Sequence, residues 1–143
     1  MGEARQAMDA VTEAVFNKNP EAAARLYGPD AVAITPDQGE LTGREQIAQY
    51  IKQLTDAFPD ATYEPISTHE SGDTAVDEGY FVGTNTEPLP MPTGESIPAT
   101  GKRVRLRSCD VATVEDGLIT SHRFYFDQME FLGQLGLLPE MPS

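Results

Sequence analysis

Apolar residues in the first part of the chain recur at helical spacing. Met8, Val11, Ala14 and Val15 keep the three- and four-residue steps of an amphipathic helix. The segment 17–20 then ends this helix and begins another, because Asn19 is a typical N-cap and Pro20 suits the first helical position. The pattern therefore predicts a helical hairpin.

A short strand and a third helix follow. The second helix is predicted to end within 26–29, and residues 31–35 read as a strand closed by Pro36. Thr42 and Glu45 have the spacing of a capping box at the start of the third helix. An apolar stripe then continues until Pro59 ends the helix, and its members are Ile47, Ile51, Leu54 and Phe58.

Beyond Pro59 the pattern changes to strands, which are predicted at 62–70, 74–86, 103–114 and 118–126. The last two are joined by Asp116-Gly117, a strong hairpin signal. The segment 87–98 contains four prolines, which exclude a central strand and indicate an exposed loop, a candidate lid. Helices followed by a strand meander predict an α+β fold, in which about three N-terminal helices cover one face of a curved antiparallel sheet.

Strand alternation predicts which side chains meet inside this sheet. In the strand 103–114, Asp110 shares a face with apolar residues and Ser108, whereas three arginines share the other face. In the last strand, His122 shares a face with Phe124 and Phe126. The apolar faces are expected to point inward, so Asp110 and His122 are predicted to face one cavity.

Composition narrows the classes of partner. The 143 residues suit one domain, 1–143, with a real core. A formal charge of −13 repels phosphate backbones and anionic lipids, so neither nucleic acid nor a membrane is an expected partner. Cys109 is the one cysteine, and the N-terminus has no signal-peptide pattern, which favours a cytoplasmic, soluble protein. The two histidines and this cysteine lie far apart and have no metal-ligand spacing, so no metal is expected. No other cofactor is predicted.

Several short motifs resemble the SnoaL-like polyketide cyclase branch of the nuclear-transport-factor-2-like (NTF2-like) superfamily. They are Leu26-Tyr27, Asp30-Ala-Val32 with Pro36, Leu41-Thr-Gly-Arg-Glu45, Gly83-Thr-Asn-Thr86, Asp110-Val111, Asp116-Gly117, Tyr125-Phe-Asp127 and Gln134-Leu-Gly136. The resemblance implies a cone in which a curved sheet and three helices enclose an apolar pocket, usually in a homodimer. It does not fix the function, because the superfamily includes cyclases, isomerases, epoxide hydrolases, dehydratases and binding proteins.

Functional residues of the superfamily can be carried over only in part. Asp110 resembles the protonated aspartate with which ketosteroid isomerases donate a hydrogen bond to an oxyanion. The general base of those isomerases would fall at Thr35, and the last-strand aspartate of the epoxide hydrolases at Phe124. The acid/base aspartate of the cyclases resembles Asp127, although the tryptophan common four residues earlier is Arg123.

Each candidate also has a structural alternative. Asp127 is either catalytic or an N-cap, since Glu130 follows at capping-box spacing. Asp110 is either a pocket residue or a partner in a strand-edge salt bridge, and His122 is either a general base or a satisfied core histidine. Phe124 and Phe126 are either ligand wall or plain core.

The leading prediction is cofactor-free acid–base catalysis of the cyclase or isomerase kind on an apolar, carbonyl-bearing metabolite. His122 or Asp127 would remove a proton next to the carbonyl, and a neutral Asp110 would stabilise the enolate oxygen. Thr35, Ser108, Phe124 and Phe126 are the expected substrate contacts. The alternatives are a binding protein for a hydrophobic metabolite and a dimeric interaction module whose cavity is filled. The resemblance and the arginine-rich sheet face, which needs an acidic partner or water, together predict a homodimer that buries part of this face.

Overall fold

The structure is a computed structural model that describes residues 2–90 and 94–138. The four helices of this part are α1 (Glu3–Phe16), α2 (Pro20–Ala24), α3 (Arg44–Ala57) and α4 (Gln128–Gln134). Its strands are β1 (Tyr27–Thr35), β2 (Gly39–Thr42), β3 (Thr62–Ser71), β4 (Thr74–Thr84), β5 (Leu89–Pro90), β6 (Ser96–Ile97), β7 (Arg103–Glu115) and β8 (Leu118–Phe126).

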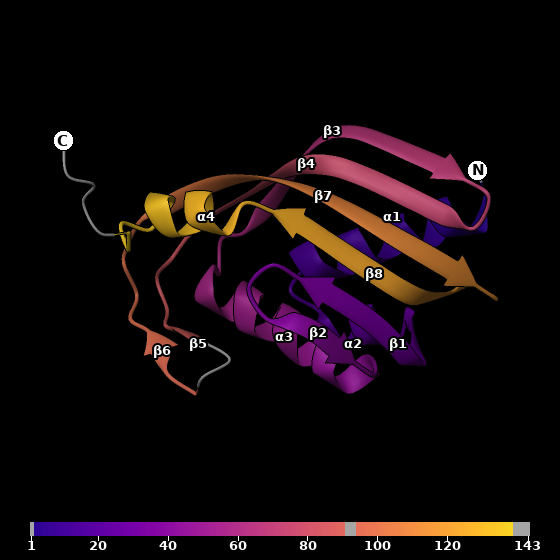
Figure 1. The fold of residues 1–143 in the computed structure, drawn as a ribbon, viewed down its shortest axis with the longest axis horizontal. Helices are drawn as coiled ribbons and strands as arrows, with labels where there is room; N and C mark the ends of the chain where they lie inside the picture. The colour runs from indigo at the N-terminus through magenta and orange to yellow at the C-terminus, as the bar shows by residue number, and fades with distance from the viewer. Residues whose placement is uncertain (1, 91–93, 139–143) are drawn as a thin grey trace.

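Six strands form one curved sheet in the order β2-β1-β8-β7-β4-β3. Figure 1 shows α1, α2 and α3 against its concave face, with α4 following β8 at one end. The predicted α+β fold is therefore confirmed. The sheet is mixed rather than wholly antiparallel, because β1 pairs with β8 in parallel. The pairing brings the start of the chain's first strand beside its last strand, which matters for the site.

Local signals explain most element ends, with two corrections. The second helix ends at Ala24 rather than within 26–29, because Tyr27 already begins β1. The Asn19 side chain accepts a hydrogen bond from the Ala22 backbone N–H at 3.0 Å, as expected for the predicted N-cap. The predicted capping box of α3 is wrong, because the helix begins one residue later with Gly43 as its N-cap. Gln46 rather than Glu45 reaches back, and its Oε1 accepts from the Thr42 N–H at 2.9 Å.

The two short strands β5 and β6 correct the prediction for 87–98. They pair as a separate two-stranded sheet, and Leu89 is buried among residues of α3 and α4 such as Ala57 and Phe131. The segment is thus not wholly an exposed loop, although its prolines do keep it out of the main sheet. Residues 91–93 lie outside the described residues.

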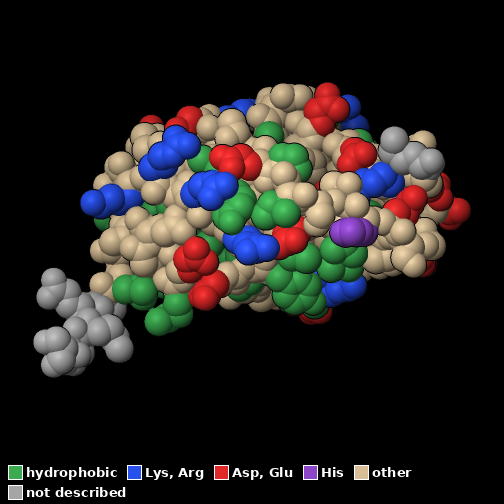
Figure 2. Space-filling model, turned by 90° about the horizontal axis from the view of Figure 1, so that it is seen from above, with side chains coloured by type: hydrophobic (Ala, Val, Ile, Leu, Met, Phe, Trp, Pro, Cys, Tyr) green, Lys and Arg blue, Asp and Glu red, His purple; other side chains and the backbone are tan. Residues whose placement is uncertain are grey.

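The convex face of the sheet carries the predicted arginine stripe. Arg105 pairs with Glu64 at 2.9 Å and Arg107 with Glu78 at 2.6 Å, all within the chain's own sheet. Figure 2 shows basic and acidic side chains interspersed over this face. Two of the three arginines of the stripe are therefore paired within the chain, and the homodimer remains a prediction. No helix in the described part is long and apolar enough to cross a membrane.

Candidate active site

A pocket of about 110 Å³ lies between the concave face of the sheet and helices α1 and α3. That volume is several times what one water molecule requires. One part of its wall is apolar, with Val15, Phe16, Leu54, Phe81, Leu106 and Phe131. The polar residues that line it are Thr12, Tyr27, Asp37, Tyr50, Tyr63, Ser108, Asp110 and His122.

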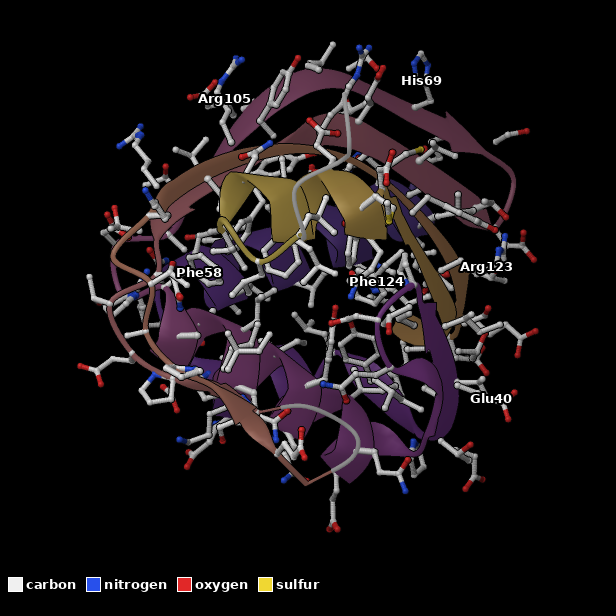
Figure 3. The ribbon with its side chains drawn as sticks, turned by 60° about the vertical axis from the view of Figure 1, so that its left-hand side comes forward. Glu40, Phe58, His69, Arg105, Arg123 and Phe124 are labelled. Atoms are coloured by element: carbon white, nitrogen blue, oxygen red, sulfur yellow. The ribbon has the colours of Figure 1, made fainter. Side chains whose placement is uncertain are left out.

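Asp110 and His122 both line this pocket, as strand alternation predicts. They stand on adjacent strands, because Asp110 of β7 pairs with Phe124 and Ala112 pairs with His122 of β8. Figure 3 shows Phe124 directed into the interior, whereas its neighbour Arg123 points outward. The inward face of β8 is thus the face with His122, Phe124 and Phe126, and all three line the pocket.

The His122 ring is buried, with 3 % of its surface exposed, and is held on both sides. It stacks on Phe124 with centroids 3.9 Å apart and planes inclined by 13°. On the other side, its Nδ1 lies 2.7 Å from the hydroxyl of Tyr27. Tyr27 comes from the start of β1, so the parallel pairing of β1 with β8 is what brings the two together.

This hydrogen bond assigns the tautomer of neutral His122. Burial, followed by the negative charge of Asp110, raises the pKa of Tyr27, so the phenol keeps its proton. The hydroxyl has no other hydrogen-bond partner among the described residues. If the hydroxyl donates to Nδ1, one group, the Nε2–H of His122, stays without a partner. If Nδ1–H donates to the hydroxyl oxygen instead, two groups stay without a partner, the phenol proton and the Nε2 lone pair. We therefore assign the proton of neutral His122 to Nε2.

The His122 Nε2 is a buried polar atom without a hydrogen-bond partner in the described chain. It lies 3.8 Å from Oδ2 of Asp110, which exceeds the length of a hydrogen bond. The Asp110 side chain is 24 % exposed, so it is reached from the pocket as well as from His122. An unpaired donor beside a carboxylate suits an oxygen-bearing ligand and is costly without one.

A second polar pair, missed by sequence reasoning, is formed by Asp37 and Tyr50. The Tyr50 hydroxyl donates to Asp37 Oδ1 at 3.1 Å. Burial is the first cause of a pKa of Tyr50 well above its usual range, and the charge of Asp37 adds to it. The signal for Tyr50 was present in the sequence, since it lies on the apolar stripe of α3 between Ile47 and Ile51.

The remaining predicted site residues divide into two groups. Ser108 lines the pocket, together with Phe124 and Phe126, as expected for substrate contacts. Thr35 is buried but does not line the pocket, and its Oγ1 accepts from the Gln38 N–H at 2.9 Å, which closes the turn after β1. Thr35 is thus a turn residue in this structure.

Asp127 has the structural role that was its alternative. Its carboxylate accepts from the backbone N–H groups of Met129 at 2.9 Å and Glu130 at 3.2 Å, which makes it the N-cap of α4. The residue is exposed and is not part of the pocket wall. The contacts therefore give no support to a catalytic role for Asp127.

Among the described residues, the wall of the pocket contains two carboxylates and no lysine or arginine. The buried Arg5 is engaged nearby, with Asp77 at 2.6 Å and Asp9 at 2.8 Å. Burial first, and then the charge of Asp110, raises the pKa of Tyr63 on the same wall. The wall therefore favours neutral or cationic ligands over anions. No group of three or more metal-ligating side chains occurs among the described residues.

A model of the SnoaL-like domain matches residues 5–122 of the chain. Comparison with curated protein sequences gave no match. Among solved structures, a proposed SnoaL-like polyketide cyclase from Jannaschia sp. CCS1 has a TM-score of 0.83 at 16 % identity, covering 96 % of this chain and 94 % of that chain.

Two further structures extend the range of named activities. IdmH, a proposed polyketide cyclase from Streptomyces antibioticus, has a TM-score of 0.76 at 24 % identity, with 94 % of this chain and 99 % of that chain covered. An LEH-like epoxide hydrolase from M. tuberculosis has a TM-score of 0.70 at 22 % identity, with 94 % of this chain and 90 % of that chain covered. At these identities the similarity shows a shared fold, and the chemistry has to be argued from the site.

Proposed function

We propose that this chain, which belongs to the SnoaL-like domain family, performs cofactor-free acid–base catalysis on an apolar, carbonyl-bearing small molecule. The observation that carries the proposal is the buried Nε2 of His122, a residue of the pocket wall. This nitrogen has no hydrogen-bond partner among the described residues and lies 3.8 Å from the Asp110 carboxylate. A neutral donor and a base side by side on an otherwise largely apolar wall suit the removal of a proton next to a carbonyl group.

The contacts of His122 favour a division of roles opposite to the one expected from the sequence. Because Tyr27 holds Nδ1, the Nε2–H is a donor that is directed at the carbonyl oxygen. Asp110 is then the base that takes the proton from the adjacent carbon, and the electron pair of that C–H bond forms the enolate. In an isomerisation, Asp110 returns the proton to another carbon. In a cyclisation, the enolate carbon attacks a second carbonyl of the same molecule, the π electrons of that carbonyl move to its oxygen, and the resulting alkoxide takes the proton back from Asp110.

The contribution of each group to the reaction rate is taken from the usual effects of a general base and of an oxyanion donor in enzymes. A positioned general base contributes about 10²- to 10⁴-fold, and a preorganised donor to a developing oxyanion about 10²- to 10³-fold. The stack of His122 on Phe124 and its hydrogen bond to Tyr27 fix the donor before the ligand arrives. The lack of lysine and arginine on the wall supports a neutral carbonyl compound rather than a carboxylate or phosphate as substrate.

Hydrogen–deuterium exchange tests this proposal without knowledge of the natural substrate. The protein is incubated in D₂O with a panel of cyclic and aryl ketones, and deuterium incorporation next to the carbonyl is followed by NMR. Wild-type protein is expected to accelerate exchange of the ketones that it binds. Asp110→Asn is expected to lose at least about 100-fold of that rate with little change in ketone affinity.

Asp127→Asn is the matched control, because asparagine caps a helix about as well as aspartate does. It is expected to keep the wild-type exchange rate and the wild-type melting temperature. If Asp127→Asn loses exchange while Asp110→Asn keeps it, the assignment of the base is wrong. Wild-type protein that binds ketones without exchanging them would instead support the binding protein, the class favoured by the apolar part of the wall.

A further inference from the structure

The geometry points to Tyr63 as a specificity-determining residue whose hydroxyl donates a hydrogen bond to the polar group of the ligand, on the side of Asp110 opposite His122. This inference rests on the proposed function for the nature of the ligand. Tyr63 lies on β3, the strand at one edge of the sheet, and its side chain nevertheless lines the pocket.

Gly79 of β4 makes that reach possible. A Cβ atom at Gly79 would overlap Cζ and the hydroxyl oxygen of Tyr63, so the end of the tyrosine ring occupies the place of a side chain on β4. No positive φ is recorded for Gly79, so the backbone conformation alone does not require glycine here. The missing side chain instead provides the space through which the Tyr63 hydroxyl crosses β4.

The strand register then places the hydroxyl beside the catalytic pair. Gly79 is directly opposite Ser108 of β7, which lines the pocket two residues before Asp110. Directly opposite residues in an antiparallel pair have Cβ atoms about 5 Å apart, so the Tyr63 hydroxyl lies next to Ser108. In the sheet, β7 lies between β4 and β8, so Tyr63 and His122 approach Asp110 from opposite sides.

The electrostatics of Tyr63 agree with this position. Burial is the largest cause of its raised pKa, and the charge of Asp110 is the next. Tyr63 therefore remains a phenol, which can donate a hydrogen bond, throughout the working range of the protein. Its ring stacks on Phe16 of α1 with centroids 5.6 Å apart, which fixes the direction in which the hydroxyl points.

Tyr63 is also the tyrosine of the pocket wall whose hydroxyl is not committed. The hydroxyl of Tyr27 is engaged with His122, and that of Tyr50 with Asp37. Within residues 2–90 and 94–138, the Tyr63 hydroxyl has no hydrogen-bond partner. A preformed donor of this kind discriminates between ligands with and without an acceptor at that place.

The test compares two ligands of nearly the same shape. One is 1-tetralone, and the other is the hydrocarbon in which a methylene group replaces the ketone oxygen. Dissociation constants are measured by ligand-observed NMR for the wild type and for Tyr63→Phe, which keeps the ring over Gly79. The ketone is expected to bind Tyr63→Phe about three- to tenfold more weakly, with unchanged binding of the hydrocarbon.

Tyr80→Phe is the matched control, because Tyr80 also loses a hydroxyl but lies outside the pocket, under the guanidinium of Arg105. It is expected to bind both ligands as the wild type does. The inference is overturned if Tyr63→Phe binds the ketone as tightly as the wild type, if both ligands weaken equally, or if the wild type has no preference for the ketone.

Failure of the proposed catalysis remains distinguishable from failure of this inference. The affinity ratio of ketone to hydrocarbon is an equilibrium quantity that does not depend on deuterium exchange. If the wild type catalyses no exchange but Tyr63→Phe loses the preference for the ketone, the proposed catalysis is refuted and the role of Tyr63 is supported. If the wild type catalyses exchange but Tyr63→Phe keeps the wild-type affinity ratio, the catalysis is supported and the role of Tyr63 is refuted.

Discussion

Tyr27→Phe is the substitution that tests the assignment of His122 most directly. It removes one oxygen atom from a fully buried side chain and keeps the ring, which lies 5.9 Å from the imidazole centroid. The 2.7 Å hydrogen bond to Nδ1 is lost, and no other described residue is placed to replace it. Nothing else in the contacts of Tyr27 depends on the hydroxyl, because its backbone carbonyl is what Arg44 binds.

The expected loss of stability follows from the unpaired nitrogen. A buried polar group without its partner costs about 1–3 kcal/mol. With an unfolding entropy of about 2.1 cal/mol/K per residue, the 143 residues correspond to about 0.3 kcal/mol/K. The melting temperature of Tyr27→Phe is therefore expected to fall by about 3–10 °C.

Calorimetry measures this shift, and ¹⁵N NMR of the imidazole reports which nitrogen carries the proton. In the wild type, we expect the neutral His122 to carry its proton on Nε2. In Tyr27→Phe, we expect this preference for the Nε2–H tautomer to be weakened, because the hydrogen bond to Nδ1 is absent. Tyr125→Phe serves as the control, since Tyr125 is 54 % exposed on the convex face and should not change the melting temperature. A wild-type signal from an Nδ1–H imidazole would refute the tautomer assignment and, with it, the donor role of Nε2.

Three further predictions concern side-chain hydrogen bonds that stabilise the fold. Asn85→Ala is expected to cost about 2–4 kcal/mol in urea denaturation, because the buried amide donates to the carbonyls of Ala57 and Glu87 and accepts from Thr100, which connects the end of α3 to both ends of the segment 85–102. Asp60→Asn should lower the free energy of unfolding at pH 7 but not at pH 2. Hydrogen bonds from the Thr84 backbone N–H and hydroxyl lower the pKa of Asp60 in the folded protein. The stabilisation by the Asp60 carboxylate is therefore complete above the pKa of the unfolded state and is lost as the pH falls through the lower pKa of the folded state. Asp127→Ala should cost about 1 kcal/mol by thermal melts, whereas Asp127→Asn should be near neutral; equal losses would contradict the N-cap role.

The parts of the site that sequence could predict are those that depend on strand alternation. Asp110 and His122 stand on two strands joined by a two-residue turn, so the period of two and the turn together decide which faces meet. Strand alternation does not predict the orientation of residues beyond the end of the strand. β8 ends at Phe126, so Asp127 has left the sheet and begins a helix.

The missed residues depend on contacts between distant segments. Tyr27 and His122 are 95 positions apart and meet because β1 runs parallel to β8, a pairing that no local period indicates. Tyr63 reaches the pocket because a glycine on the neighbouring strand leaves room for its ring. Strand β2 was missed for a local reason, since its four residues include one buried side chain and have no alternation to detect.

The positions at which two related families carry catalytic carboxylates are not carboxylates in this chain, and polar residues of the pocket wall lie two positions away from them. The last-strand aspartate of the epoxide hydrolases would fall at Phe124, and the polar residue of this chain is His122, two positions earlier. Two positions on a strand that are two residues apart lie on the same face of the sheet, so a polar side chain can lie at either of them on the pocket wall without any change in strand register. Likewise, the position of the isomerase base is Thr35, but the carboxylate on the pocket wall is Asp37, in the turn after β1. On the last strand, the inward face is therefore a better guide to the polar residue of the pocket wall than the aligned position.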